Sequence, residues 1–279
     1  SDLLEARGFE VVTLNADEKG YINLEELERE VDENTILVSI MYVNNEVGTV
    51  QPIEKMAEII KSKNKNCIFH TDCVQAFGKH PINGKHFDAI SVSGHKIHCP
   101  KGVGVLYLRK GVRAKNLHFG GGQEKGFRPG TENTGSIVAM GLGAEIAKRD
   151  LEKNFEKVKA VKEKLMTICD ILPDVYVNGD SENGSPYILN LSFEGVKGEV
   201  LLHALENYEI YVATGSACSS RAKEKKKIVD YLIDGRGSST VRFSFDCENT
   251  VEEAEKAIEV LKEQVPMLRM FQQIGRASC

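Results

Sequence analysis

The chain has 279 residues, of which 41% are hydrophobic and 28% are charged. This composition supports a buried core and excludes an intrinsically disordered chain. Thirty-six basic residues against 41 acidic ones give a net charge of −5, which argues against nucleic acid as a direct partner. No apolar run reaches the roughly 20 residues of a membrane-spanning helix, so we expect no membrane association.

The seven cysteines are irregularly spaced and odd in number, so they do not form the pattern of a disulfide framework. Such cysteines are typical of a reducing compartment, and we therefore expect a cytoplasmic protein. The first residues, Ser1–Phe9, include charged side chains and no apolar stretch, which predicts no secretory signal.

The first half of the chain alternates predicted strands with predicted helices. The expected strands are Glu10–Leu14, Thr35–Tyr42, Cys67–Thr71, Ala89–Ser93 and Val103–Leu108. Asn23 and Glu26 predict one helix start, and Pro52 predicts another helix over Ile53–Lys63. The apolar run Thr35–Tyr42 predicts a strand buried on both faces of a parallel sheet. We therefore expect an α/β fold with a parallel-rich mixed sheet flanked by helices.

The second half of the chain has longer predicted helices and fewer strands. It begins after the glycine-rich stretch Gly120–Gly135, which predicts an exposed loop. The expected helices cover residues 136–148, 154–169, 199–207 and 250–264, and the expected strands are Tyr187–Phe193, Ile210–Ala213 and Val241–Phe245. We place a domain boundary near Lys148, with a large domain over residues 1–147 and a smaller α+β domain over residues 148–279.

Polar side chains follow two of the predicted strands, where an α/β sheet carries its active site. Asp72 could hold a cationic heteroaromatic nitrogen, although an aspartate that caps a strand is the alternative. Lys96 follows Ser93 and His95, and a lysine there suits carbonyl chemistry if burial or a nearby cation lowers its pKa. An ordinary exposed lysine is the alternative for Lys96.

A metal site is a further alternative for this region. Its ligands would be His70, Cys73, His95, His98 and Cys99. Zinc ligands are rarely interleaved with lysine and proline in this way, so we expect no metal.

Two further residues stand out in the second half. Cys218 lies among small and hydroxyl residues, as an accessible sulfur nucleophile requires, and a buried structural cysteine is the alternative. Arg242 lies inside the apolar strand Val241–Phe245 and must find an anion there. It is either an ion-paired core residue or a clamp for a substrate carboxylate, whose shape matches the guanidinium.

Together and in this order, these segments resemble the cysteine desulfurases, the class V branch of the pyridoxal-phosphate-dependent aminotransferases. The matching segments are Val43–Ile53, His70–Ile82, Phe87–Arg109, Gly120–Thr134, Ala213–Ser220 and Val241–Thr250. The resemblance covers nearly the whole chain. It implies a large domain with a parallel-rich mixed sheet, a smaller C-terminal domain, and a homodimer with the site at the subunit interface.

The resemblance also implies which residues bind pyridoxal phosphate. Lys96 would bond covalently to the cofactor, Asp72 would pair with its pyridine nitrogen, and Gln75 would hydrogen-bond its phenolic oxygen. The implied phosphate ligands are Ser93, His95 and, from a second copy of the chain, Thr131.

The substrate residues follow from the same resemblance. Asn45 would lie between the cofactor and the substrate carboxylate, Arg242 would clamp that carboxylate, and Cys218 would carry a persulfide. The implied activity is removal of sulfur from L-cysteine to give L-alanine. The sulfur would pass to an acceptor protein, either an iron–sulfur scaffold or a tRNA-thiolation enzyme.

The chain departs from the family pattern at its N-terminus. Family members begin with a further segment that carries a Gly-Thr-Glu-Ser phosphate loop and a histidine that stacks on the cofactor ring, and neither is found in Ser1–Cys279. We therefore expect weak cofactor binding by this chain alone, and a partly exposed Thr35–Tyr42 strand. The alternatives are a cofactor-poor homologue that acts as a binding or scaffold protein, or another class V enzyme such as a selenocysteine lyase.

Overall fold

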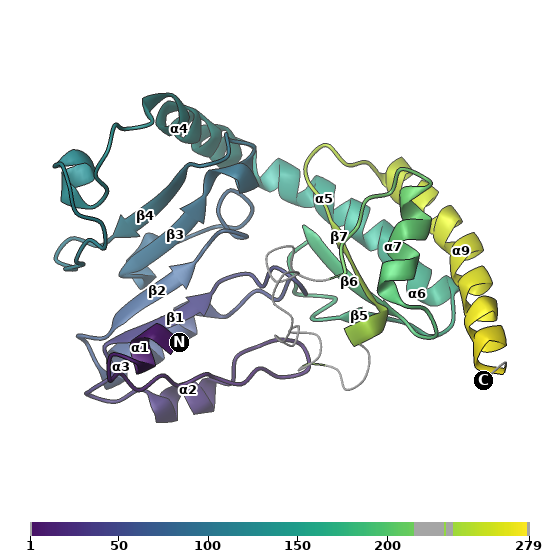
Figure 1. Ribbon diagram of the computed structural model, residues 1–279, viewed down its shortest axis with the longest axis horizontal. Helices are drawn as coiled ribbons and strands as arrows, with labels where there is room; N and C mark the ends of the chain where they lie inside the picture. The colour runs from purple at the N-terminus through teal and green to yellow at the C-terminus, as the bar shows by residue number, and fades with distance from the viewer. Residues whose placement is uncertain (1, 215–231, 233–236, 278–279) are drawn as a thin grey trace. The chain divides into compact units, whose positions relative to one another are not determined.

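The computed structural model describes residues 2–214, 232 and 237–277, with side chains as far as Phe271. Contacts divide the chain into two compact units (Figure 1). The first, called here the antiparallel-sheet unit, combines Ser1–Glu30, Val43–Gln51 and Glu152–Cys279. The second, called the parallel-sheet unit, comprises Val31–Tyr42 and Pro52–Leu151.

The parallel-sheet unit is built on a four-stranded sheet with the order β1-β2-β3-β4. The first three strands are parallel and β4 is antiparallel, which confirms the predicted parallel-rich mixed sheet. The strands are β1 (Leu37–Met41), β2 (Ile68–Asp72), β3 (Ala89–Ser93) and β4 (Gly104–Leu108). The helices are α3 (Ile53–Lys63), α4 (Thr134–Arg149) and the short 3-10 helices η1 (Gly84–His86), η2 (Gly94–Ile97) and η3 (Gln123–Gly126).

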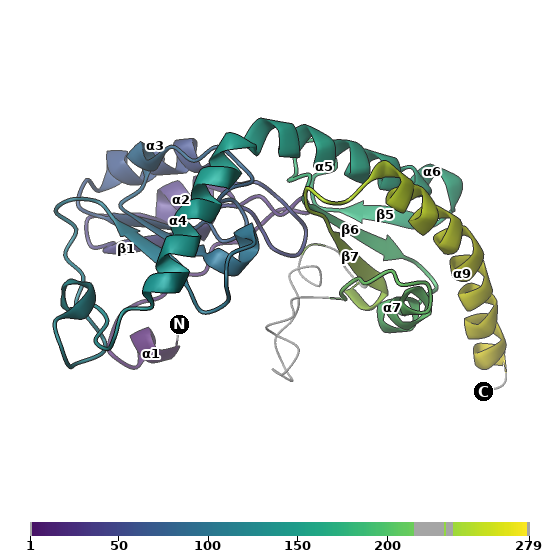
Figure 2. The ribbon, with the colours of Figure 1, turned by 90° about the horizontal axis from the view of Figure 1, so that it is seen from above.

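The described residues bury the β1 and β2 side chains on one face of this sheet more completely than those on the other. Helix α3 lies against that face (Figure 2), where Met56 and Phe69 are both buried. On the opposite face Leu37 is 49% exposed and Leu106 is 57% exposed. The prediction that Thr35–Tyr42 is buried on both faces is therefore wrong, because burial alternates along β1. The expected partial exposure of this strand is confirmed.

The antiparallel-sheet unit contains a three-stranded sheet with the order β5-β6-β7, and its neighbouring strands are antiparallel. The strands are β5 (Val175–Asn178), β6 (Ile188–Phe193) and β7 (Thr240–Ser244). The helices are α1 (Asp2–Glu5), α2 (Leu24–Glu30), α5 (Leu151–Met166), α6 (Ile168–Ile171), α7 (Gly198–Glu206), α9 (Val251–Ala277) and the 3-10 helix η4 (Gly237–Ser239).

The two faces of this second sheet differ in character because strand side chains alternate. Leu191 of β6 and Val241 of β7 lie on one face, in an apolar core shared with α5, α6, α7 and α9. Asn190 and Arg242 are directly opposite each other on the other face. The segment Val43–Gln51 lies over that polar face, since the Asn190 amide donates to a carbonyl of this segment.

Several local predictions are confirmed. Helix α3 covers the expected residues, and the Asn23 side chain accepts a hydrogen bond from the Glu26 N–H (3.0 Å) at the start of α2. The Glu26 carboxylate, however, turns to the backbone and side-chain amides of Asn15. Among the helices of the described residues, none has the length and apolar character needed to cross a membrane.

Other local predictions are wrong. Glu10–Leu14 forms no strand, because it finds no neighbouring strand within the described part of the chain. Ile210–Ala213 forms no strand, and its one bridge within the described part of the chain joins Ala213 to Arg242. Strand β5 is not predicted from the sequence, and α9 extends beyond the expected end at residue 264.

Candidate functional site

Asp72 lies at the carboxyl end of β2, where local backbone groups hold it. Its carbonyl accepts the Tyr42 N–H (2.9 Å), and its carboxylate accepts the Val74 N–H (2.8 Å). The side chain is half-buried. This arrangement leaves a fixed negative charge at the end of the strand, with acceptor capacity to spare.

Ser93, His95 and Lys96 lie at the equivalent end of β3, where η2 begins. The Ser93 hydroxyl and the His95 Nδ1 are 2.7 Å apart. Gly94 makes the close turn possible, because a Cβ there would lie 2.8 Å from the Val103 side chain. Lys96 is half-buried in η2.

Strands β2 and β3 are parallel neighbours, so their carboxyl ends meet at one edge of the sheet. Asp72 is opposite Ser91, two residues before Ser93. The structure therefore brings a carboxylate, a hydroxyl–imidazole pair and a primary amine to one edge. These groups suit an aromatic, aldehyde-bearing anion, because the carboxylate can hold a protonated ring nitrogen and the amine can attack the aldehyde.

His70 shares the face of Asp72, two residues earlier on β2, and has no role in the sequence analysis beyond the metal alternative. Its Nδ1 is 2.8 Å from the Ser39 hydroxyl and its Nε2 is 2.9 Å from the Ser91 hydroxyl. Burial lowers the pKa of His70, and the charge of Asp72 opposes this only in part. The ring is therefore neutral near pH 7.

The described residues contain no group of three side chains placed to hold a metal ion. Cys73, one residue after Asp72, is completely buried. Burial raises the pKa of its thiol to about 12, so Cys73 is neither a thiolate ligand nor an effective nucleophile.

The two remaining predicted cofactor residues also belong to the parallel-sheet unit. Gln75 is half-buried in the turn that follows Asp72. Thr131 is exposed in the loop before α4, where Asn133 caps the helix by accepting the Ser136 N–H. The exposure of Thr131 leaves its hydroxyl accessible to a second molecule.

The antiparallel-sheet unit brings together Asn45 and Arg242. The Arg242 Nη1 donates to the Asn45 carbonyl (3.0 Å), and the nearby Glu46 charge favours the guanidinium. Burial nevertheless lowers the pKa of Arg242. Its Nε is buried and has no hydrogen-bond partner among the described residues. A buried N–H donor without a partner can accept a ligand that brings a hydrogen-bond acceptor. A substrate carboxylate is such a ligand, because its two oxygens match the guanidinium.

The predicted site residues therefore form two groups, one in each unit. The parallel-sheet unit holds Asp72, Gln75, Ser93, His95, Lys96 and Thr131, and the antiparallel-sheet unit holds Asn45 and Arg242. Cys218 lies outside the described residues.

Asn190, whose amide contacts the backbone beside Asn45, is not predicted from the sequence as a residue of this group. The available signal was its place in the otherwise apolar stretch Ile188–Leu191, because an amide inside such a strand must find partners. Nothing in the sequence says which partners these are.

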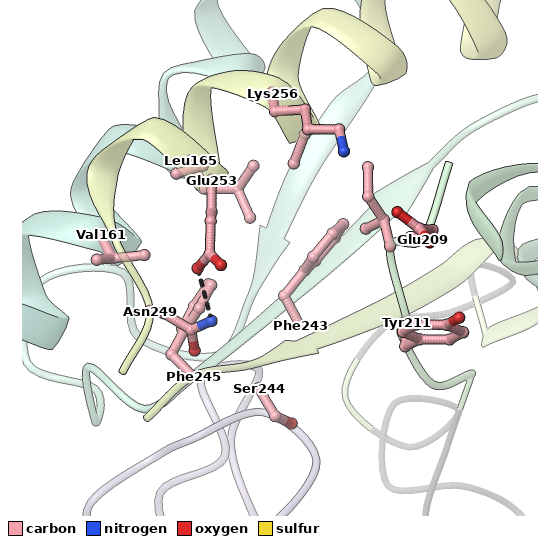
Figure 3. A pocket seen from close by; sticks show the side chains of 13 residues that line it. Val161, Leu165, Glu209, Tyr211, Phe243, Ser244, Phe245, Asn249, Glu253 and Lys256 are labelled. Atoms are coloured by element: carbon pink, nitrogen blue, oxygen red, sulfur yellow. Dashed lines mark hydrogen bonds between the residues drawn. The ribbon is translucent and has the colours of Figure 1, made fainter. Parts of the chain in front are cut away.

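A separate cavity of about 430 Å³ lies within the antiparallel-sheet unit (Figure 3). The segment Glu209–Tyr211 and the end of β7 both line it. Its walls include Phe243 and Phe245, and the Asn249 amide donates to the Glu253 carboxylate at its edge. None of the predicted site residues lines it.

Comparison with known proteins shows a family relationship over most of the chain. Residues 1–257 match the family described as aminotransferase class-V. A protein named cysteine desulfurase from Nostoc sp. is 40% identical over 273 residues, which cover 95% of this chain and 67% of that protein. A protein named cysteine desulfurase IscS from Pectobacterium carotovorum is 41% identical, over 95% of this chain and 66% of its own length.

Solved structures give the same result. A structure named NifS-like protein is 36% identical, with a TM-score of 0.87, over 95% of this chain and 71% of that one. A structure described as SspA in complex with cysteine is 29% identical, with a TM-score of 0.72, over 88% of this chain and 68% of that one. The chain thus spans about two thirds of the length of the curated relatives it matches.

Proposed function

Because the chain belongs to the aminotransferase class-V family, we propose that it is a pyridoxal-phosphate-dependent cysteine desulfurase. Its substrate would be L-cysteine, and its products L-alanine and a persulfide on Cys218. The observation that carries this proposal is the open, buried Nε donor of Arg242, which suits the carboxylate of an amino acid. The cluster at the ends of β2 and β3 supports it.

The residues at the sheet edge fit pyridoxal phosphate by their chemistry. Lys96 offers an amine for the aldehyde, and Asp72 offers an acceptor for the protonated ring nitrogen. The hydroxyl–imidazole pair of Ser93 and His95 offers donors for the phosphate, with Gln75 available to the phenolic oxygen. When bound, the cofactor supplies an electron sink that makes the Cα–H bond of the substrate acidic.

Each residue then has a defined task in the proposed reaction. Lys96 moves the proton at the substrate Cα, and Asp72 keeps the ring nitrogen protonated. Arg242 and Asn45 hold the substrate carboxylate end. The thiolate of Cys218 takes the substrate sulfur, so one carbon–sulfur bond breaks and one sulfur–sulfur bond forms. The substrate carbon receives a proton, and cysteine plus enzyme thiol becomes alanine plus enzyme persulfide.

The first test uses two substitutions in the cofactor-loaded protein. Lys96→Ala should abolish both the visible absorption band of the bound cofactor and alanine formation from cysteine, because no other amine takes its place. Cys218→Ser should keep the absorption band and yet form no alanine. Reductive trapping of the cofactor on another lysine would contradict the first expectation, and persulfide on Cys247 would contradict the second.

Several broader features are part of the same proposal. We infer a homodimer in which Thr131 of one copy reaches the phosphate of the other, a cytoplasmic location, and a sulfur acceptor that serves iron–sulfur assembly or tRNA thiolation. The domain division into residues 1–147 and 148–279 is also proposed. The free cysteines of the described residues are buried or half-buried, which is consistent with a reducing compartment.

A further inference from the structure

A row of buried amides crosses the polar face of the antiparallel sheet. Asn178 of β5 is directly opposite Asn190 of β6, which is directly opposite Arg242 of β7. The two asparagines are only 1% and 3% exposed. Burying an amide costs free energy unless its NH2 and C=O groups are hydrogen-bonded. The hydrogen-bond partners of the two asparagines therefore determine how their side chains are oriented.

The hydrogen bonds of Asn178 orient Asn190. The Asn178 Nδ2 donates to the Asn190 Oδ1 (2.7 Å) and to the Ser192 hydroxyl (2.8 Å), and the Ser192 hydroxyl and the Asn178 Oδ1 are 3.1 Å apart. The oxygen of Asn190 is therefore occupied by a donor, which forces its NH2 group to the other side. There it donates to the Glu46 carbonyl (3.1 Å).

The same backbone segment also holds Arg242. The Asn45 carbonyl accepts from the Arg242 Nη1 (3.0 Å), and the next carbonyl, of Glu46, accepts from Asn190. Arg242 and Asn190, which are neighbours across β7 and β6, thus donate hydrogen bonds to two successive backbone carbonyls. Asn44 also holds this segment, because its Oδ1 accepts from the Glu46 and Val47 N–H groups. Loss of the Asn190 hydrogen bond would therefore remove the cross-strand contact beside the acceptor that orients the guanidinium, and would shift that acceptor and the open Nε donor.

We propose that Asn190, oriented by Asn178, is a positioning residue that aims the Arg242 guanidinium at the α-carboxylate of the substrate. Asn190 acts through Arg242 and the Asn45–Glu46 backbone and touches no substrate itself. The identity of the ligand rests on the proposed function, whereas the geometry of the row does not.

The test compares two ligands that differ only in the carboxylate. In the cofactor-loaded full-length protein, absorbance titrations give the Kd of L-alanine and of L-alaninamide. Asn190→Leu should raise the Kd of L-alanine about tenfold, the effect of losing about 1.4 kcal/mol of binding. The Kd of L-alaninamide should change less than about twofold, because it lacks the charge that Arg242 binds.

Three further variants separate positioning from simple loss of stability. Asn178→Asp keeps the shape of the row but removes the donor that orients Asn190, so it should weaken L-alanine binding selectively even if Asn190→Leu folds poorly. Val177→Ala removes core volume on the opposite face of β5 and should leave both Kd values unchanged. Combined with Arg242→Lys, Asn190→Leu should cause no further loss, because both act through one group.

An equal rise for both ligands, or an additive loss in the double variant, would overturn the inference. If the unsubstituted protein binds both ligands equally, the carboxylate clamp of the proposed function fails instead. Crystal structures then decide the inference independently: it predicts a displaced guanidinium in Asn190→Leu, and an unmoved Arg242 with its Asn45 contact intact would refute it.

Discussion

At the scale of single residues, Arg242 illustrates how burial and function are linked. It is half-buried, it uses only part of its donor fork on the Asn45 carbonyl, and it keeps a buried Nε without a described acceptor. Arginine that merely filled the core would be expected to pair all of its buried donors. The unfilled donor is what the proposed clamp requires, and the nearby Glu46 charge makes an ion-paired core residue the alternative that kinetics must separate from it.

Arg242→Lys should raise the KM for cysteine by about tenfold or more, because a lysine ammonium cannot reproduce the planar fork. The change in kcat should be smaller, since the contact holds the carboxylate before and during reaction. Steady-state kinetics check this. An unchanged KM together with a lower Tm would support the core alternative.

Lys162 gives a second prediction at this scale, on stability. Its ammonium is buried and donates to the Ser185 carbonyl (2.9 Å). Burial lowers its pKa from 10.5 to about 8, although the charges of Asp180 and Glu163 oppose the shift. Between about pH 8 and 10.5 the unfolded chain therefore holds more protons at this residue than the folded one, so its contribution to stability rises with pH.

The free energy of unfolding, measured by urea denaturation, should therefore rise with pH in the unsubstituted protein relative to Lys162→Met. Comparison at each pH cancels the titration of other groups. Lys159→Met, on the exposed side of α5, is the control and should show no such trend relative to the unsubstituted protein. A flat difference between pH 8 and 10 for Lys162→Met would contradict the prediction.

At the scale of elements, the backbone of the segment Val43–Gln51 lies very close to the backbone of the antiparallel-sheet unit where it crosses the polar face of the sheet. Gly179, just after β5, has a φ of +93°, and a Cβ there would lie 2.7 Å from the Val47 carbonyl. Within the segment, Gly48 has a φ of +76°, and a Cβ there would lie 3.1 Å from the Ile188 Cβ of β6. Two glycines thus allow the backbone of this segment to approach the antiparallel sheet closely.

Gly179→Ala should destabilise the protein more than Gly111→Ala. Both glycines have a positive φ, which costs about 1–2 kcal/mol for a residue with a side chain. Gly111 has open space around its Cβ, whereas at Gly179 a backbone atom must also move, which adds about 1–3 kcal/mol. Thermal unfolding of the two variants gives the comparison, and equal losses would show that only φ matters.

At the scale of the whole molecule, α4 carries an exposed apolar stripe. The stripe consists of Ile137, Val138, Leu142 and Ile146, and Val138 is 71% exposed. A cluster of this kind marks an interaction surface more often than scattered apolar residues do. Thr131, which the proposed homodimer would bring to the other subunit, lies only three residues before α4. We therefore expect a second copy of the chain to cover the stripe.

Leu142→Lys should shift the protein from dimer toward monomer in sedimentation experiments, because it places a charge in the middle of the stripe. Val200→Lys is the matched control, since Val200 is an exposed apolar residue on α7. The control should remain dimeric. A fully dimeric Leu142→Lys protein would place the interface elsewhere.

The sequence by itself determined the features that depend on short-range order. The strand-end positions of Asp72 and Ser93, the helix over Ile53–Lys63 and the cap at Asn23 all follow from local alternation, proline and side-chain hydrogen bonding. The cofactor residues stay a prediction, which the family resemblance of contiguous motifs implies. The signals for these features lie within a few residues of each other, although packing and strand pairing supply their stability.

Only the tertiary structure decided which distant groups meet. Asn190 and Glu46 are 144 residues apart, and Arg242 and Asn45 are 197 residues apart, so no local pattern joins them. The same holds for β1, whose apolar run is covered by described residues on one face alone. Whether a residue is buried or paired depends on which other segments pack against it. Those segments can be far away in the sequence, so only the folded chain brings them together.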